Sequence, residues 1–408
     1  MRRRAAWSLL QAALVVAVAV VAWLLWHPPG ERRPIVIGVL HSLSGTLAVS
    51  EAPLVAAVQM AAAEINAAGG LLGRPVQVLV EDTRSDPARA AVAAERLIGE
   101  KQAVALFGCW TSACRKAVKP VIEAHRHLLF YPMAYEGLEQ SPHIVYLGAS
   151  PNQQLLPATG WAMQGFGRRV YLVGSDYVFP RVAHALLRDF VQLQGGQVLG
   201  ERLLPLGSTG MADVVVDLRR LKPDLVLSTI NGDSNAALFG ALADAGMGSL
   251  PLLSFSADEP AMHAEGGGRL ERHFAAWSYL ASLPGPGNGD FLARLRRFDG
   301  DRAKASDPVV SAYVGVQLWA AAVREVGDPQ TEAVNANIGQ QSVVAPHGVA
   351  IVDAQTRHLW RQLRIAQVRA DGRLDEVFAS PRYIKPSPWP TYRPKAFWEA
   401  LPESHAER

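Results

Sequence analysis

From Pro34 onward, the chain alternates short apolar runs with amphipathic segments. The runs "PIVIGVL", "RPVQVLV" and "VALFG" predict buried strands, and the segments between them place apolar residues at helical spacing. The first such segment ends at Gly69–Gly70, a common helix stop. After a break near Gly148–Asn152, the same rhythm begins again at "RVYLVGS". Strands that alternate with helices predict the α/β class with parallel sheets, and the two blocks predict two similar lobes.

The last third of the chain is less regular. Helical spacing continues through "FLARLRRF" and "VVSAYVGVQLWAAAVREVG", and later strands are predicted at "PHGVAIVD", "RQLRIAQVRADG" and "RLDEVFASP". We expect the late helices to return to the first lobe and the last strands to the second, and these crossings would make a hinge. The expected parts are residues 34–147 and 282–344 for the first lobe, 148–281 and 345–390 for the second, and 391–408 for a C-terminal tail.

The N-terminus carries an uncharged apolar segment, Ala5–Trp26, within an expected anchor and linker of residues 1–33. It is long enough to cross a bilayer as a helix, and the preceding Arg2–Arg4 favour a cytoplasmic start. A cleaved signal peptide is the alternative, but "VAWLLWHPPG" offers no clear cleavage site, and the segment has no cysteine for lipoprotein acylation. We expect an uncleaved signal-anchor, which tethers a periplasmic protein to the inner membrane.

Composition narrows the class of protein further. The chain is 49% hydrophobic and 19% charged, which is typical of a globular protein. Its net charge of +3 comes from Arg2–Arg4, and no long basic block follows, so no nucleic-acid surface is expected. The two cysteines, Cys109 and Cys114, would lie at a strand end and in the first turn of a helix. Bridging them would need a strained geometry, so two unpaired, buried thiols are expected.

Aromatic and polar residues gather where the predicted strands end. In open parallel α/β sheets, ligands bind beyond the carboxyl ends of the strands. At "LFGCWTSACRK", Ser112 is the expected N-cap of a helix whose free N–H groups can hold a carbonyl oxygen or a carboxylate. Trp110 can form a flat wall there, and Pro120 is expected to kink or interrupt the helix.

No catalytic pattern stands out in the sequence. "GCWTSACRK" lacks the second glycine of a nucleophile elbow, and "GVLHSLSG" does not match the dinucleotide-binding G-x-G-x-x-G. The histidines show no metal-ligand spacing. We therefore expect no cofactor, no metal and no enzymatic activity, with an amidase as the enzymatic alternative.

Seven stretches together carry a family resemblance: "IGVLHSLSGTLAVSE", "AAEINAAGGLLGRPV", "FGCWTSACRKAVKPV", "LLFYPMAYEG", "GASPNQQLLPA", "GSDYVFPR" and "STINGDSN". They resemble the substrate-binding proteins of urea and short-chain amide ABC transporters, from Pro34 to about Trp389. The amide-sensing regulator of an amidase operon is a close relative. The resemblance implies a type I periplasmic binding protein, with two Rossmann-like lobes, a three-crossover hinge and ligand in the cleft.

The resemblance also implies the ligand-binding residues. Ser112 occupies the ligand-hydroxyl position and Trp110 the aromatic wall, while Tyr177 closes over the ligand from the opposite lobe. The full set is Trp110, Ser112, Tyr131, Met133 and Tyr135 on the first lobe, and Tyr177, Asn231 and Ser256 on the second. Met133–Ala134 departs from the Val–Gln of the urea-binding members.

The expected function is therefore a membrane-tethered periplasmic receptor for urea or a small uncharged amide, which presents its ligand to ABC permease subunits. Closure of the lobes around the ligand is the expected mechanism. Two alternatives remain open. One is a tethered amide sensor subunit that signals to a kinase or regulator, and the other is a receptor for a solute like a branched-chain amino acid.

Overall fold

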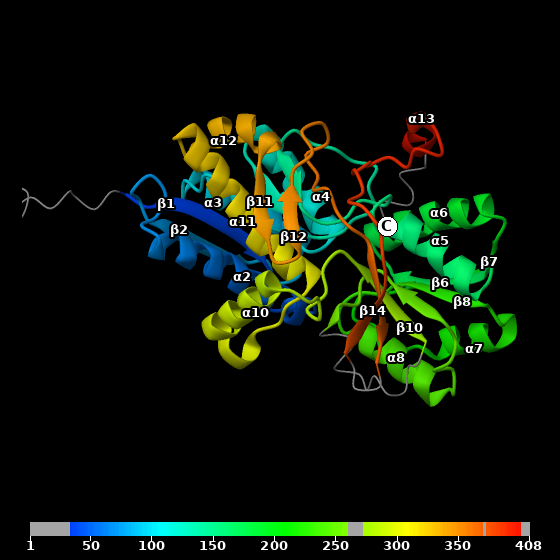
Figure 1. The fold of residues 1–408 in the computed structure, drawn as a ribbon. Helices are drawn as coiled ribbons and strands as arrows, with labels where there is room; N and C mark the ends of the chain where they lie inside the picture. Colours follow the sequence, from blue (N-terminus) through cyan, green and yellow to red (C-terminus); the bar gives the residue numbers. More distant parts are fainter. Residues whose placement is uncertain (1–32, 260–271, 370–372, 401–408) are drawn as a thin grey trace, which may run out of the picture.

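Two lobes, each built on its own sheet, lie side by side in the computed structural model, which describes residues 33–259, 272–369 and 373–400 (Figure 1). The predicted α/β class with parallel sheets is confirmed. The predicted membrane span Ala5–Trp26 lies outside the described residues. Within them, one helix is long and apolar enough to cross a membrane, α2 (Ala48–Ala67), and its inner face belongs to the core of the first lobe.

The first lobe holds a five-stranded parallel sheet in the order β2-β1-β3-β4-β5. Its strands are β1 (Ile35–His41), β2 (Val76–Asp82), β3 (Leu106–Gly108), β4 (Leu129–Tyr131) and β5 (Ile144–Tyr146). The helices that follow them are α2, α3 (Pro87–Gly99) and α4 (Ser112–Ala124). Because β1 pairs with both β2 and β3, the chain reverses its winding direction at β1, and the helices cover both faces of the sheet.

The second lobe holds a seven-stranded sheet in the order β14-β13-β10-β9-β8-β6-β7. Its strands are β6 (Arg169–Ser175), β7 (Gln197–Leu204), β8 (Leu225–Thr229), β9 (Leu252–Ser254), β10 (His273–Trp277), β13 (Arg364–Val368) and β14 (Leu374–Ala379). Its helices are α5 (Leu155–Phe166), α6 (Val178–Leu193), α7 (Ala212–Leu221) and α8 (Ser234–Asp244). Within this sheet β13 alone runs against the other strands, so both of its pairings, with β10 and with β14, are antiparallel. Strand β6 pairs with both β7 and β8, so the winding reverses at β6.

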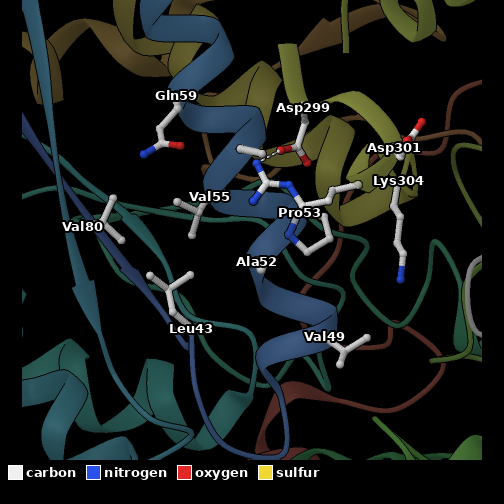
Figure 2. A pocket seen from close by; sticks show the side chains of 12 residues that line it. Leu43, Val49, Ala52, Pro53, Val55, Gln59, Val80, Asp299, Asp301 and Lys304 are labelled. Carbon is white, nitrogen blue, oxygen red and sulfur yellow. Dashed lines mark ion pairs between the residues drawn. The ribbon is translucent and has the colours of Figure 1, made fainter. Parts of the chain in front are cut away.

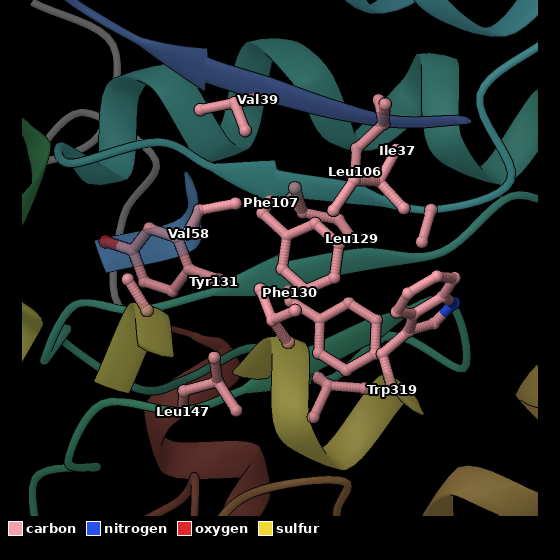
Figure 3. Packing of buried hydrophobic residues seen from close by; sticks show 14 of the residues in the cluster. Ile37, Val39, Val58, Leu106, Phe107, Leu129, Phe130, Tyr131, Leu147 and Trp319 are labelled. Atoms are coloured by element: carbon pink, nitrogen blue, oxygen red, sulfur yellow. The ribbon is translucent and has the colours of Figure 1, made fainter. Parts of the chain in front are cut away.

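The first-lobe core is centred on aromatic rings between the sheet and a late helix (Figure 3). Phe107 and Phe130 stack at 4.7 Å between ring centroids, and Trp319 meets Phe107 edge-on at 6.2 Å. Trp319 comes from α11 (Asp307–Val326), which packs beside α2 together with α10 (Pro286–Asp299). The late helices therefore return to the first lobe, as the sequence predicts.

Three passages of the chain between the lobes meet at one buried ion pair. Arg361 lies 3.1 Å from the Asp307 carboxylate and donates through Nε to the Leu147 carbonyl at 2.8 Å. The same carboxylate accepts the backbone N–H groups of Ser278 and Tyr279, each at 2.8 Å. The first passage contains Leu147, the second runs from Ser278 to Asp307, and the third contains Arg361. The ion pair therefore holds the three hinge segments together.

Some segments lie differently from the sequence-based expectation. The hairpin of β11 (Ser342–Ala345) and β12 (Gly348–Ile351) packs on the first lobe, where Ala350 and Val352 join its core, although the boundary at 345 would give β12 to the second lobe. The expected tail instead forms a short helix, α13 (Lys395–Glu399), whose Trp398 is buried in the second-lobe core. The remaining short elements are α12 (Thr331–Asn337), η2 (Gly300–Arg302) and η3 (Ile338–Gln340).

Candidate functional site

The points where the two sheets reverse their winding face each other across the interface between the lobes. Ligands in α/β sheets bind at such switch points, beyond the carboxyl ends of the strands. On the first lobe, the relevant ends belong to β1 and β3, and α4 begins there. On the second lobe, they belong to β6 and β8, and α6 contacts α4. Topology thus brings the N-termini of two helices and four strand ends to one cleft.

Seven of the eight sequence-predicted site residues line one small cavity in this cleft. They are Trp110, Ser112, Tyr131 and Met133 from the first lobe and Tyr177, Asn231 and Ser256 from the second, joined by Ala134 and Phe179. The cavity holds about 10 Å³, which is room for about one water. A solute as small as urea therefore requires the lobes to move apart before it enters, as in a hinge-bending receptor.

The corner between β3 and α4 differs from the expectation in three ways. The N-cap of α4 is Thr111, whose hydroxyl accepts the Cys114 N–H at 3.1 Å, and Ser112 is the first helical residue. Helix α4 also runs through Pro120 without interruption. Finally, Cys109 and Cys114 form a disulfide, so the expectation of two free thiols is wrong.

A left-handed backbone conformation at Cys109 explains the bridge. Its φ of +65° turns the chain sharply, and the Cα atoms of the two cysteines lie 5.5 Å apart, within disulfide range. Gly108 precedes it with φ +152°, and an added Cβ would lie 2.2 Å from the Leu40 carbonyl oxygen. The disulfide therefore closes a tight loop that carries Trp110, Thr111 and Ser112 into the cleft.

A buried charge cluster, formed by Arg115, Glu136 and Glu139, lies directly behind this loop. Arg115 is fully buried and donates to Glu136 at 2.9 Å, to Glu139 at 2.9 Å and to Ser112 Oγ at 3.0 Å. Its guanidinium also stacks over the rings of Tyr131 and Tyr135, with the guanidinium carbon 4.9 and 4.6 Å from the ring centroids. The cluster fixes the position of Ser112 from behind.

The cluster also shifts the protonation of its members. Burial disfavours the charge of Arg115, but Glu139 and Glu136 outweigh it and raise the pKa of Arg115 well above its usual range. Burial would raise the pKa of Glu139, yet Arg115 and the nearby Lys119 lower that pKa to about 2. Both groups are therefore charged at neutral pH, although little water reaches them.

Ser112 has its hydroxyl proton engaged within this cluster. Its Oγ donates to the Glu136 carboxylate at 2.5 Å while it accepts from Arg115. The oxygen can still accept a hydrogen bond from a ligand N–H, but it has no second proton to give. In this arrangement the Ser112 hydroxyl therefore cannot donate to a ligand carbonyl.

Two first-lobe tyrosines hold the cleft wall in place. Tyr131 lines the cavity, and its hydroxyl donates to the Trp110 carbonyl at 3.0 Å. Tyr135 does not line it: its hydroxyl lies 2.6 Å from His358 Nε2 and 3.0 Å from the Glu139 carbonyl. Tyr135 thus supports the cleft from behind, and burial raises the pKa of both phenols.

The second-lobe half of the cleft is uncharged. The backbone N–H of Asn231 donates to Ser175 Oγ at 3.0 Å, and its side-chain nitrogen lies 3.3 Å from Ser256 Oγ. Tyr177 stands before α6, and burial raises its pKa, with further contributions from Tyr131 and Glu136 across the cleft. Tyr177 lines both cavities together with first-lobe residues.

Two further hollows lie near the cleft. One, of about 160 Å³, is lined by both lobes and shares Tyr177 with the small cavity. The other, of about 590 Å³, lies between α2 and the segment Asp299–Lys304, where Asp299 pairs with Arg302 (Figure 2). Its lining comes from the first lobe alone, so closure of the lobes would not enclose a solute there.

A sequence profile for the periplasmic binding protein domain matches residues 35–395. The chain belongs to this family. Among curated relatives, the Leu/Ile/Val-binding protein homolog 6 of Brucella melitensis is 23% identical over 346 residues, covering 81% of this chain and 87% of the relative. Homolog 4 from the same organism is 23% identical over 336 residues, covering 78% and 80%.

Solved structures of this family share the fold. An ABC transporter solute-binding protein from Rhodopseudomonas palustris, solved with 4-hydroxybenzoate, superimposes with a TM-score of 0.77 at 22% identity, covering 86% of this chain and 97% of that one. A leucine-binding protein from Thermotoga maritima gives a TM-score of 0.74 at 18% identity, covering 85% and 98%. At these identities the likeness establishes the fold of this family member and leaves its ligand open.

Sequence reasoning missed the charge cluster behind the cleft. Arg115 and Glu136 lie inside stretches that carry the family resemblance, and Glu139 lies two residues after one of them, yet charged residues are usually solvent-exposed. One signal was available: Arg115 lies one helical turn after Ser112, on the same face of α4.

Proposed function

We propose that this protein is an extracytoplasmic receptor for urea or a small uncharged amide, which it presents to ABC permease subunits without altering it. Its N-terminal segment, residues 1–33, would tether it to the inner membrane as an uncleaved signal-anchor. The eight residues named from the sequence would form or support the site. Family membership supports the receptor role and its place outside the cytoplasm, and the chemistry of the cleft supports the ligand class.

The proposal of an uncharged ligand rests on the absence of charged side chains from the described lining of the cavity. No charged side chain lines the small cavity among the described residues. Behind the cavity, the Glu136 carboxylate accepts the Ser112 hydroxyl. A bound anion would lie close to this carboxylate, and the guanidinium beside Ser112, that of Arg115, lies outside the cavity lining and is already paired with Glu136 and Glu139. An anion without a free cationic partner in a buried site is costly. An uncharged amide avoids that cost.

The cavity offers the hydrogen-bonding groups that an amide needs. Trp110 Nε1–H is buried without a partner in the described structure, so it can donate to a carbonyl oxygen. Ser112 Oγ can accept an amide N–H, and Asn231 and Ser256 add a second polar edge from the other lobe. Tyr177 would then cover the ligand when the lobes close, and this contact stabilises the closed state.

Matched ligand pairs test the ligand class by calorimetry on the purified full-length protein. We expect acetamide or urea to bind and acetate, leucine and 4-hydroxybenzoate not to bind, because only the anions and zwitterions carry a carboxylate. Leucine binding without any amide binding would instead support the amino-acid alternative, which the names of the relatives also suggest. Ammonia release in proportion to protein would contradict a receptor without enzymatic activity.

Three variants test the site. Ser112→Ala, Trp110→Ala and Tyr177→Phe should each weaken amide binding, since a lost buried hydrogen bond costs roughly 1–3 kcal/mol, or about 5- to 150-fold in affinity. Ser342→Ala, at an exposed serine of the first lobe, is the matched control and should change nothing. Unchanged affinity in all three variants would place the ligand elsewhere.

The tether and the partner need separate tests. N-terminal sequencing of native protein should find the anchor intact, and a chain beginning near residue 28 or later would show cleavage. The sensor alternative, in which the closed lobes signal to a kinase or regulator, predicts co-purification with such a protein in place of permease subunits.

A further inference from the structure

The 160 Å³ cavity at the mouth of the cleft has the features of a second binding compartment. It is lined by the ends of β1 and β2 and by the first turn of α4 on one side, and by Tyr177 and Leu206 of the second lobe on the other. Tyr177 also lines the small inner cavity, so the two spaces share this residue. One water needs about 10–15 Å³, so the outer cavity has room for several non-hydrogen atoms.

Glu51 gives this cavity a carboxylate oxygen that is free to bind. The side chain comes from α2 and is only 3% exposed. Its Oε2 lies 2.8 Å from His41 Nδ1 and accepts the Ser42 N–H at 3.0 Å. Its Oε1 has no hydrogen-bond partner among the described residues, and Glu51 lines the cavity. One oxygen is thus held by local donors, which fixes the carboxylate and leaves the other for a ligand.

The rest of the lining favours a ligand group with positive charge. The hydroxyl-bearing residues Ser42, Thr83 and Thr111 line the same space, together with Asp86, whose carboxylate caps α3 and lies 3.7 Å from Arg89. No lysine, arginine or histidine is among the described lining residues. His41 contacts only Oε2 of Glu51, so a ligand cation can make a charge-assisted hydrogen bond to Oε1 and add to the compensation of this nearly buried carboxylate.

We propose that the outer cavity is a subsite for the cationic end of the ligand, an ammonium or amidinium group. Its uncharged amide end then occupies the inner cavity beside Trp110 and Ser112. This inference rests on the proposed function and extends its substrate class from uncharged amides to short amides that also carry a positive charge a few bonds from the carbonyl. Glu51 is the residue that recognises that charge, and Leu206 covers it from the second lobe.

The test compares propionamide with 3-aminopropanamide, which differ by one ammonium group, on the full-length protein by calorimetry. We expect the cationic amide to bind at least about tenfold more tightly, since hydrogen bonds to charged groups are the strong ones. Glu51→Gln should bring the ratio of the two affinities to about one. Glu332→Gln, at an exposed glutamate of the same lobe, should leave the ratio unchanged.

A second variant tests the same cavity without disturbing the hydrogen bonds of Glu51. Leu206→Trp should fill the outer compartment from the second lobe and remove the preference for the cationic amide. Equal affinities in the unmodified protein, or a preference that persists in both variants, would overturn the subsite. If neither amide binds, the proposed function itself fails; if propionamide binds and the ammonium adds nothing, only the subsite fails.

Discussion

Replacing Arg115 with methionine should destabilise the first lobe severely. The change leaves Glu136 and Glu139 buried, and removes a charge-assisted hydrogen bond of 2.9 Å from each of them. Glu139 keeps Lys116 and Lys119 at 3.7 Å, but among the described residues Glu136 keeps only Ser112 as a hydrogen-bond partner. Breaking a buried ion pair by removing one partner costs about 3–5 kcal/mol.

Calorimetric melting measures this loss. For a domain of roughly 150–250 residues, 1 kcal/mol shifts Tm by about 2–4 °C, so the first-lobe midpoint should fall by about 6–20 °C. The unfolding of the second lobe should change little, because the cluster belongs to the first. Amide binding should weaken as well, since Ser112 Oγ loses the guanidinium that fixes it.

Two comparisons make this result interpretable. Arg126 forms an ion pair with Glu332 at 3.3 Å, but both side chains are largely exposed, so Arg126→Met should cost at most about 1 kcal/mol. Adding Glu136→Gln and Glu139→Gln to the Arg115 variant should restore part of the loss, because no buried charge then lacks its partner. If Arg115→Met costs no more than Arg126→Met, the cluster is not a buried, mutually compensated set and the reasoning is refuted.

Three further predictions concern buried groups elsewhere. Burial lowers the pKa of His273 to about 4, so this histidine stays neutral in the fold. As the pH falls below about 6.5, this histidine is protonated in the unfolded chain before it is protonated in the fold. The free energy of unfolding should therefore fall by up to about 3 kcal/mol between about pH 6.5 and pH 4. His273→Leu should make the free energy of unfolding, measured by denaturant titration, less dependent on pH over this range. A thiol reagent should label neither Cys109 nor Cys114 in unfolded, unreduced protein, and replacing both should cost about 2 kcal/mol in urea unfolding. Trp398→Ala should cost about 3–5 kcal/mol in the second lobe alone, measured by the same unfolding, since its ring is buried there and Nε1 donates to the Pro390 carbonyl at 2.7 Å.

Much of the fold was predictable because its repeating units are local. An apolar run followed by helical spacing identifies a strand and a helix wherever both are long, as in β1 with α2 and β6 with α6. Helix α5 was missed because Pro157, Gly160 and Gly165 lie within it and argue against a helix. Strand β10 was missed because "HFAAW" is a short run with no clear alternation.

The location of the site was predictable from the topology of the sheets, but its hydrogen bonds were not. The rule that ligands lie beyond strand ends found residues of both lobes, and seven of them share one cavity. Hydrogen-bond roles could not be read in the same way. The Ser112 proton goes to Glu136, 24 positions away, and the Cys109–Cys114 bridge depends on a left-handed backbone conformation that a non-glycine residue seldom adopts.

The distribution of charge gives the two halves of the cleft different tasks. Every charged group found next to the cleft cavities in the described residues belongs to the first lobe, where Arg115 and Glu136 hold Ser112 fixed before any ligand arrives. The second lobe contributes Tyr177 and Asn231, which carry no charge. A ligand that meets the first lobe therefore finds its strongest contacts already in place, and closure desolvates only uncharged groups of the second. Because the hinge passages are tied together at the buried Arg361–Asp307 pair, closure can proceed as a rotation of two preformed lobes, and the affinity is set largely by what the first lobe recognises.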